Sequence, residues 1–79
     1  MTNIKITVKL FAQYREGNFK VAYMFFEHNT QVAEVIKYIG LDIQKYPIGI
    51  LIVNGRHVDD GHVLQENDTL GIFPKVGGG

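Results

Sequence analysis

The stretch TQVAEVIKYIG, residues 30–40, decides the fold, because it combines a helical period with signals for both helix ends. Thr30 is the expected N-cap, since its hydroxyl can accept a backbone N–H of the first turn. Gly40 stands where a left-handed residue would end the helix. A helix this short, with one apolar face, must lie on a sheet. That face comprises four residues at the i, i+3, i+4, i+7 spacing: Val32, Val35, Ile36 and Ile39.

The segments before this helix have the pattern of a hairpin. Residues 3–10, NIKITVKL, alternate apolar and polar side chains, which is the period of a half-buried strand. Residues 12–18 are polar and contain Gly17-Asn18, which is typical of a connection between strands. A second, aromatic-rich strand is expected over residues 19–26.

The segments after the helix complete the sheet. Residues 48–53, IGILIV, are almost uniformly apolar, and Asn54-Gly55 predicts a tight turn into a short strand at 56–58. A final strand is expected at residues 70–73, after an Asn67-Asp68 turn. The first and last strands could pair as parallel neighbours at the centre. The order of elements predicts an α+β roll, with a mixed four- to five-stranded sheet and one main covering helix.

Composition narrows the class of protein. The chain has 79 residues, 46% of them hydrophobic, and eight basic against eight acidic residues. A neutral chain lacks the basic excess of a nucleic-acid binder, and no apolar run approaches the roughly 20 residues of a membrane span. The N-terminus has no signal-peptide pattern, and there are no cysteines for disulfides, thiolate metal sites or nucleophilic catalysis. We expect one cytoplasmic domain, without a nucleic-acid or membrane partner.

The polar side chains do not form a catalytic or metal motif. Three histidines are present, but none has a metal-ligand spacing to another histidine or to a suitable carboxylate, so they are expected to be solvent-facing residues: His28, His57 and His62. The acidic pairs Asp59-Asp60 and Glu66/Asp68 are expected to serve turns, where aspartate is favoured for backbone reasons. We therefore predict no bound metal or cofactor and no enzymatic activity of the chain alone.

The C-terminus is the exception. The chain runs from its last strand through Pro74-Lys75-Val76 into Gly77-Gly78-Gly79. Glycine is costly to order and has no side chain to pack, so residues 76–79 are expected to form a flexible tail outside a domain of residues 1–75. A frayed end or a cloning remnant is the simplest reading. A glycine tail can also enter a narrow channel and present its terminal carboxylate for activation in another protein.

Five segments in the right order resemble the MoaD/ThiS family of sulfur carriers, which are small β-grasp proteins of ubiquitin-like fold, and the resemblance is closest to MoaD. The asparagine of the fourth segment stands where the family usually has glycine, and Lys75 stands where MoaD usually has a second proline. The segments are LFAQYRE at 10–16, TQVAEV at 30–35, VNG at 53–55, LQEND at 64–68 and IFPKVGGG at 72–79.

This resemblance implies a reaction at the C-terminus. The Gly79 carboxylate would be adenylated by a ubiquitin-activating-type enzyme of the MoeB/ThiF kind, which uses ATP and magnesium. It would then become a thiocarboxylate with sulfur from a donor such as a cysteine desulfurase. Gly78 would be its essential neighbour, and Val76 and Gly77 would lie in the partner's channel. The sulfur would pass to a MoaE-like or ThiG-like synthase. With Gly79 as the end of the chain, no processing step is expected.

The resemblance also implies a docking surface. In MoaD, hydrophobic residues matching Phe11 and Phe73 contact the adenylating partner, and we expect Phe11, Phe73, Pro74, Val76 and Gly77 to be partner-binding residues. His57 stands where MoaD is typically apolar, which leaves the third member of the surface open. Arg15 could pair with a partner carboxylate, although a solvated turn charge is the simpler expectation.

The pathway stays open at this point. The segments around Phe11 and Phe73-Pro74, and the chain length, favour the small subunit of molybdopterin synthase, which would serve molybdenum or tungsten cofactor synthesis. The triple glycine after valine and the Val53-Asn54-Gly55 turn favour a ThiS-like carrier for the thiazole of thiamin. tRNA thiolation is a further sulfur pathway. A ubiquitin-like modifier conjugated through Gly79 would use the same activated carboxylate, and a plain binding module would not need the tail.

Overall fold

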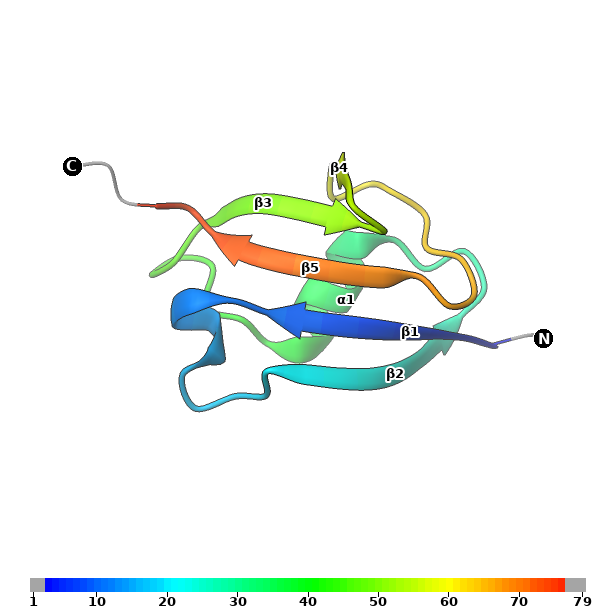
Figure 1. Cartoon of the computed structure of the whole chain (residues 1–79), viewed down its shortest axis with the longest axis horizontal. Helices are drawn as coiled ribbons and strands as arrows, with labels where there is room; N and C mark the ends of the chain where they lie inside the picture. Colours follow the sequence, from blue (N-terminus) through cyan, green and yellow to red (C-terminus); the bar gives the residue numbers. More distant parts are fainter. Residues whose placement is uncertain (1–2, 77–79) are drawn as a thin grey trace.

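The computed structural model describes residues 3–76 and consists of one twisted sheet with one helix on one of its faces (Figure 1). The elements are, in chain order, β1 (Asn3–Leu10), the 3₁₀-helix η1 (Ala12–Arg15), β2 (Val21–Glu27), α1 (Val32–Ile39), β3 (Ile48–Val53), β4 (Arg56–Val58) and β5 (Thr69–Pro74). This is the expected α+β arrangement of a mixed five-stranded sheet and a single main helix.

The strand order is β2-β1-β5-β3-β4, with β1 and β5 parallel at the centre and the other pairs antiparallel. The parallel pairing suggested by the sequence is confirmed. Its register places Lys9 beside Gly71 and Leu10 beside Ile72. The C-terminal ends of β1 and β5 therefore lie side by side at the same end of the sheet, on the left in Figure 1.

The core fills the space between the sheet and α1, which lies behind β1 and β5 in Figure 1. The alternation in β1 is confirmed, since its four apolar side chains are at most 4% exposed while their neighbours are not buried. The helix places its apolar stripe on the same core. The fully buried residues include Ile6, Val8, Leu10, Val32, Val35, Leu64, Leu70 and Ile72.

The ends of α1 confirm one prediction and correct another. Gly40 has the left-handed backbone expected at the C-terminus, with φ of 79°. The N-cap is Gln31 rather than Thr30. The Gln31 N–H donates to Glu34 Oε2 at 2.8 Å, and the Thr30 hydroxyl instead donates to the Glu27 carbonyl at 2.7 Å. Thr30 thus closes the turn that follows β2, one residue before the N-cap of α1.

The strand ends differ by one or two residues from the sequence expectation. The second strand begins at Val21 and not at residue 19, and the last strand runs from Thr69 to Pro74. The connection at 12–18 contains η1, which its polar composition did not predict. Asn54 and Gly55 have φ of 52° and 82°, the signature of the tight turn expected there. Gly77, Gly78 and Gly79 lie outside the described residues, so the division at residue 75 stays a prediction.

Candidate functional site

Two phenylalanine rings stack on the face of the sheet opposite α1. Phe11 directly follows β1, and Phe73 is in β5; their ring centroids lie 4.0 Å apart with an interplanar angle of 3°. The register brings them together, since Lys9 pairs with Gly71 and two residues further along each parallel strand is a phenylalanine. Ile72, the neighbour of Phe73, is fully buried on the other face. Alternation along β5 therefore places Phe73 on the face that points away from the core.

The backbone around Phe11 places its ring. Phe11 is extended, with φ of −130° and ψ of 155°, and so continues the direction of β1. Ala12 then has a left-handed backbone with φ of 52°, which turns the chain into η1. An L-residue other than glycine pays roughly 1–2 kcal/mol for this conformation. The turn lets Phe11 remain beside β5 while the chain leaves the sheet.

Gly71 forms the floor below the two rings. A methyl group at this position would lie 3.4 Å from Phe11 Cε2 and 3.5 Å from Phe73 Cε1. The rings therefore cover the strand backbone instead of another side chain. A hollow of about 180 Å³ beside them is lined by Lys9, Phe11, Ile52, Asn54, Gly55, Thr69, Gly71 and Phe73.

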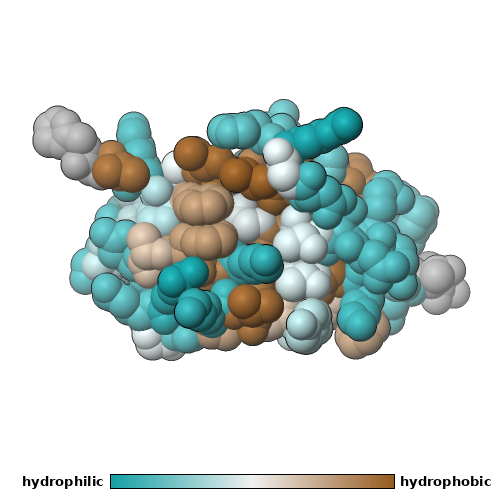
Figure 2. Space-filling model, in the orientation of Figure 1, coloured by the Kyte–Doolittle hydropathy of each residue, from teal (hydrophilic) through white to brown (hydrophobic). Residues whose placement is uncertain are grey.

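Two isoleucines of β3 extend this apolar surface, and the sequence analysis did not assign them to it. Ile50 pairs with Phe73 and is 42% exposed, and Ile52 pairs with Gly71, so both lie on the face that carries the rings. We call Phe11, Phe73, Ile50 and Ile52 the apolar patch. Figure 2 shows it as a brown area near the ends of β1 and β5, partly surrounded by hydrophilic residues. The apolar character of both faces of β3 was the available signal.

Charged and polar residues border the patch. The Arg15 guanidinium carbon lies 5.1 Å from the centroid of the Phe11 ring, and its Nε donates to the Leu10 carbonyl at 2.7 Å. Arg15 is exposed, as expected for a solvated turn charge, while this hydrogen bond holds its Nε in place. His57 pairs with Ile52 from β4 and lies on the far rim. The apolar patch therefore ends at β3 on this side, because the next strand, β4, carries a polar side chain beside Ile52.

The chain leaves the sheet next to the patch. Pro74 is buried and pairs with Ile48 at the start of β3. The Lys75 N–H donates to the Pro47 carbonyl at 2.7 Å, a bond that a proline at position 75 could not make. Val76 is 87% exposed. The expected reacting and channel residues beyond it, Gly77, Gly78 and Gly79, are outside the part of the chain that the structure describes.

The acidic residues serve turns, as predicted for Asp59 and Asp68. Asp59 Oδ1 accepts the Gly61 N–H at 3.0 Å. Asp68 is 7% exposed and accepts the Asn54 side-chain amide and the Gln65 N–H, both at 2.8 Å. Between residues 3 and 76, no group of three or more histidines, aspartates and glutamates is arranged to hold a metal ion.

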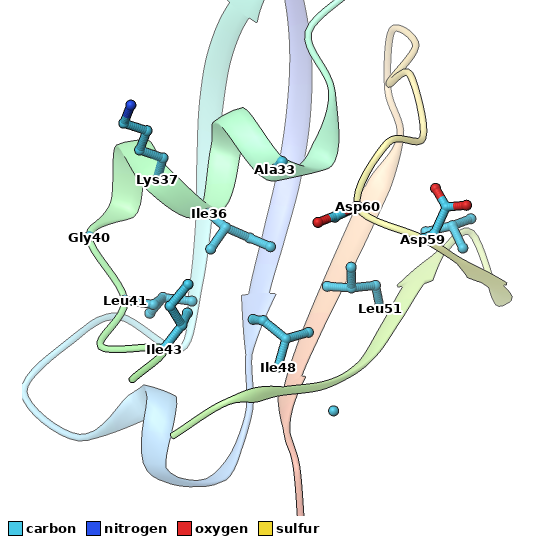
Figure 3. Close-up of a pocket in the computed structure, with 12 residues that line it drawn as sticks. Ala33, Ile36, Lys37, Gly40, Leu41, Ile43, Ile48, Leu51, Asp59 and Asp60 are labelled. Carbon is cyan, nitrogen blue, oxygen red and sulfur yellow. The ribbon is translucent and has the colours of Figure 1, made fainter. Parts of the chain in front are cut away.

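A further pocket lies on the other face, between α1 and β3 (Figure 3). It has a volume of about 650 Å³ and is lined mainly by aliphatic side chains, among them Ile36, Ile48 and Leu51. Asp59 and Asp60 stand at one side and Lys37 at the other. It exists because α1 has only eight residues and covers part of the sheet. It contains no nucleophile paired with a base.

No helix among the described residues is long and apolar enough to cross a membrane.

Comparison with solved structures supports the fold. A Pyrococcus furiosus protein assigned as molybdopterin converting factor subunit 1 superposes with a TM-score of 0.75 at 24% identity, covering 92% of this chain and 99% of that one. The small archaeal modifier protein 1 of Haloferax volcanii gives 0.72 at 19% identity, with the same coverage. These likenesses establish the ubiquitin-like β-grasp fold.

Sequence comparison identifies the family. No curated protein matches the chain. The model of the ThiS family matches residues 8–79, which includes β1 from Val8 onward, the whole of the remaining fold and the glycine tail. The resemblance to the MoaD/ThiS proteins is thereby confirmed, and the chain belongs to the ThiS family.

Proposed function

We propose that this protein is a sulfur carrier whose Gly79 carboxylate is adenylated by a partner enzyme and converted to a thiocarboxylate. The observation that carries the proposal is the position of the apolar patch. It lies on the free face of the sheet, at the edge where β5 ends and the chain continues towards Gly77-Gly78-Gly79. A partner that covers Phe11 and Phe73 is therefore close to the point where the chain leaves β5.

The chemistry requires a partner because the chain supplies only the substrate group. A carboxylate is a poor electrophile. Reaction of the Gly79 carboxylate with the α-phosphorus of ATP would expel pyrophosphate and give an acyl-adenylate. A sulfur nucleophile could then displace AMP, so that one difficult substitution becomes two easier ones. The magnesium and the catalytic side chains belong to the activating enzyme, and glycine at the last positions leaves the carbonyl unhindered.

The patch has the composition of a protein contact. Phe11 and Phe73 are stacked, Ile50 is 42% exposed, and Arg15 borders the Phe11 ring. Aromatic residues and arginine are enriched at the centre of interfaces, where they carry much of the binding energy. Phe11 and Phe73 would bind the activating enzyme, and Val76 and Gly77 would occupy its channel. Pro74 was expected to bind the enzyme as well, but it is buried and so is not available for that contact. A MoaE-like synthase would use the same surface when it accepts the sulfur.

Molybdopterin synthesis is the proposed destination of the sulfur, with this chain as the small subunit of the synthase. The segment at 10–16 and the Phe73-Pro74 pair favour it, and a structural neighbour is assigned as a molybdopterin converting factor subunit. A ThiS-like role in thiazole synthesis is the alternative within the family, favoured by the Val76-Gly77-Gly78-Gly79 ending. In that case a ThiG-like synthase would receive the sulfur.

A protein modifier is the second candidate function, because another neighbour of the same fold is named a small archaeal modifier protein. Both functions begin with adenylation, so the two are separated by the fate of the activated carboxylate. Isopeptide-linked adducts of Gly79 recovered from cells would favour the modifier. A pool of free thiocarboxylate without adducts would favour the carrier.

The first step is tested by ATP-dependent release of pyrophosphate by the host's adenylating enzyme. We expect release only when this chain is present, and none when Gly79 is deleted. The Gly61→Ala variant, which changes a distant loop glycine, should react like the wild type. No release with the full chain, from an enzyme shown active on another carrier, would overturn the proposal.

A further inference from the structure

The start of β3 holds the residue at which the tail leaves the domain. Ile48 pairs with Pro74 and Ile50 with Phe73, so Gly49 is an extra residue in the β3–β5 pairing. A methyl group at Gly49 would lie 2.7 Å from three atoms: Cα of Lys75, N of Lys75 and the carbonyl oxygen of Pro74. These are backbone atoms, which cannot rotate away as a long side chain could. Gly49 is thus required by the close approach of the departing chain.

A hydrogen bond to the residue before β3 also fixes Lys75. The Lys75 N–H donates to the carbonyl of Pro47, the residue before β3, at 2.7 Å. Lys75 is therefore the last residue with a backbone hydrogen bond to the domain in the part of the chain described. Val76 follows and is 87% exposed. The position of Lys75 relative to Phe73 is set by this bond and by the missing side chain of Gly49.

We propose that Gly49 and the Pro47–Lys75 hydrogen bond form an exit clamp, which positions the tail for the activating enzyme. The inference rests on the proposed function and assigns Gly49 as a positioning residue. The partner must hold the apolar patch and the tail at the same time. Binding at two points is strong only when the connection between them has the right geometry.

The clamp shortens the segment between the last fixed residue of the domain and the reacting carboxylate. With Lys75 fixed, only Val76 to Gly79 lie between the domain and the reacting carboxylate, a reach of at most about 14 Å at roughly 3.5 Å a residue. If Pro74 and Lys75 were also free, the carboxylate would search a larger volume. A connection already in the bound geometry reduces the ordering cost of binding.

The test compares two clamp variants with two matched controls. Gly49→Ala introduces the methyl group that meets the Lys75 backbone, and Gly61→Ala adds one where the nearest atom is a side-chain oxygen of Asp59 at 3.4 Å. Lys75→Pro removes the N–H donor, and Lys75→Ala changes the side chain but keeps the donor. Thermal unfolding of all four variants checks that the domain still folds. If Gly49→Ala does not fold, the comparison of the two Lys75 variants still tests the proposal.

Two readouts separate positioning from folding. Hydrogen exchange of the amide of residue 75 in the free chain reports the clamp itself. The exchange should be slow in the wild type and in the two controls, Gly61→Ala and Lys75→Ala. It should be faster in Gly49→Ala. The kcat/KM for ATP-dependent activation should fall about tenfold to a hundredfold in Gly49→Ala and Lys75→Pro, and stay within about twofold in the controls. Versions lacking Gly78-Gly79 should compete for the enzyme with unchanged Kd, because the patch is intact.

Two results would overturn the clamp. One is a wild-type kcat/KM in both clamp variants although exchange of the Lys75 amide is faster in Gly49→Ala. Another is a Gly49→Ala chain without Gly78-Gly79 whose Kd for the enzyme is weakened by as large a factor as the kcat/KM of full-length Gly49→Ala is lowered. The substitution would then have impaired docking itself and not the position of the tail. Lack of activation of the wild-type chain would instead remove the proposed function, and with it the need for a clamp.

Discussion

The two faces of the sheet carry different residues in alternating positions of the same strands. In β1, Leu10 is fully buried against α1, while its neighbour Lys9 borders the hollow beside the aromatic rings. In β5, Ile72 is fully buried and Phe73 stacks on Phe11. The helix side accounts for stability, and the open side is available for a partner. A substitution on one face should therefore leave the property of the other largely unchanged.

The largest effect is expected on the helix side. Leu10→Ala removes a side chain with no exposed surface and should lower the free energy of unfolding by about 2–5 kcal/mol. Lys9→Ala, one residue away on the opposite face, should change it by no more than about 0.5 kcal/mol. Urea unfolding followed by circular dichroism measures both. Equal losses would contradict the division between the faces.

Phe73→Ala should have the next largest effect, and on docking more than on folding. Loss of a central aromatic contact costs about 2 kcal/mol or more, which weakens binding to the adenylating enzyme about thirtyfold. Loss of the ring stack should cost about 0.5–1.5 kcal/mol of stability. Titration calorimetry with the enzyme measures the first value.

Phe25→Ala is the matched control, because Phe25 is a 68% exposed aromatic residue of the same face but lies on the edge strand β2. Its affinity for the enzyme should equal that of the wild type. If Phe25→Ala weakened binding as much as Phe73→Ala, the docking surface would extend over the whole open face and not be confined to the patch.

A smaller loss is expected at the opposite end of the sheet from the tail. Asp68→Asn keeps the shape of the side chain but removes the charge that accepts hydrogen bonds from Asn54 and Gln65. We expect a loss of about 1–3 kcal/mol of unfolding free energy, with unchanged kcat/KM for activation. A fall in kcat/KM at wild-type stability would mean that this turn also contacts the partner.

The smallest effect concerns Tyr14, whose hydroxyl donates to the Tyr46 carbonyl. Burial raises the pKa of the Tyr14 hydroxyl above its usual value of 10.0. The folded state then holds this proton more tightly than the unfolded state does, so the contribution to stability is complete below pH 10 and is lost as the pH rises above it. Tyr14→Phe should cost about 0.5–1.5 kcal/mol at pH 7.

The same substitution should also make the unfolding free energy fall less steeply above pH 10. Urea unfolding between pH 7 and pH 10.5 measures the slopes. Parallel curves for the wild type and Tyr14→Phe would contradict the assignment.

Sequence periodicity predicted the helix side of the molecule well, because burial imposes a regular pattern. The alternation in residues 3–10 and the stripe from Val32 to Ile39 correspond to β1 and α1. Gly40 and Asn54-Gly55 marked positive backbone angles that few other residues adopt. Thr30 was a plausible cap by residue type, but its hydroxyl bonds to the preceding turn, a choice that depends on the path of the chain.

The site was predicted less completely, because it depends on which strands are neighbours. Phe11 and Phe73 were predicted only through the resemblance to a family, and their stacking follows from the β1–β5 register. Ile50 and Ile52 join the patch through pairing with β5, and the bulge at Gly49 arises where β3 meets the departing chain. No periodicity within one segment contains that information.

Transfer of sulfur to the C-terminal carboxylate can be followed in the intact mass of the protein. The chain would be incubated with the host's adenylating enzyme, ATP, magnesium and a sulfur source. We expect a mass increase equal to the exchange of one oxygen for one sulfur, absent when Gly79 is deleted. An unchanged mass, with enzymes that convert a known carrier in parallel, would contradict it.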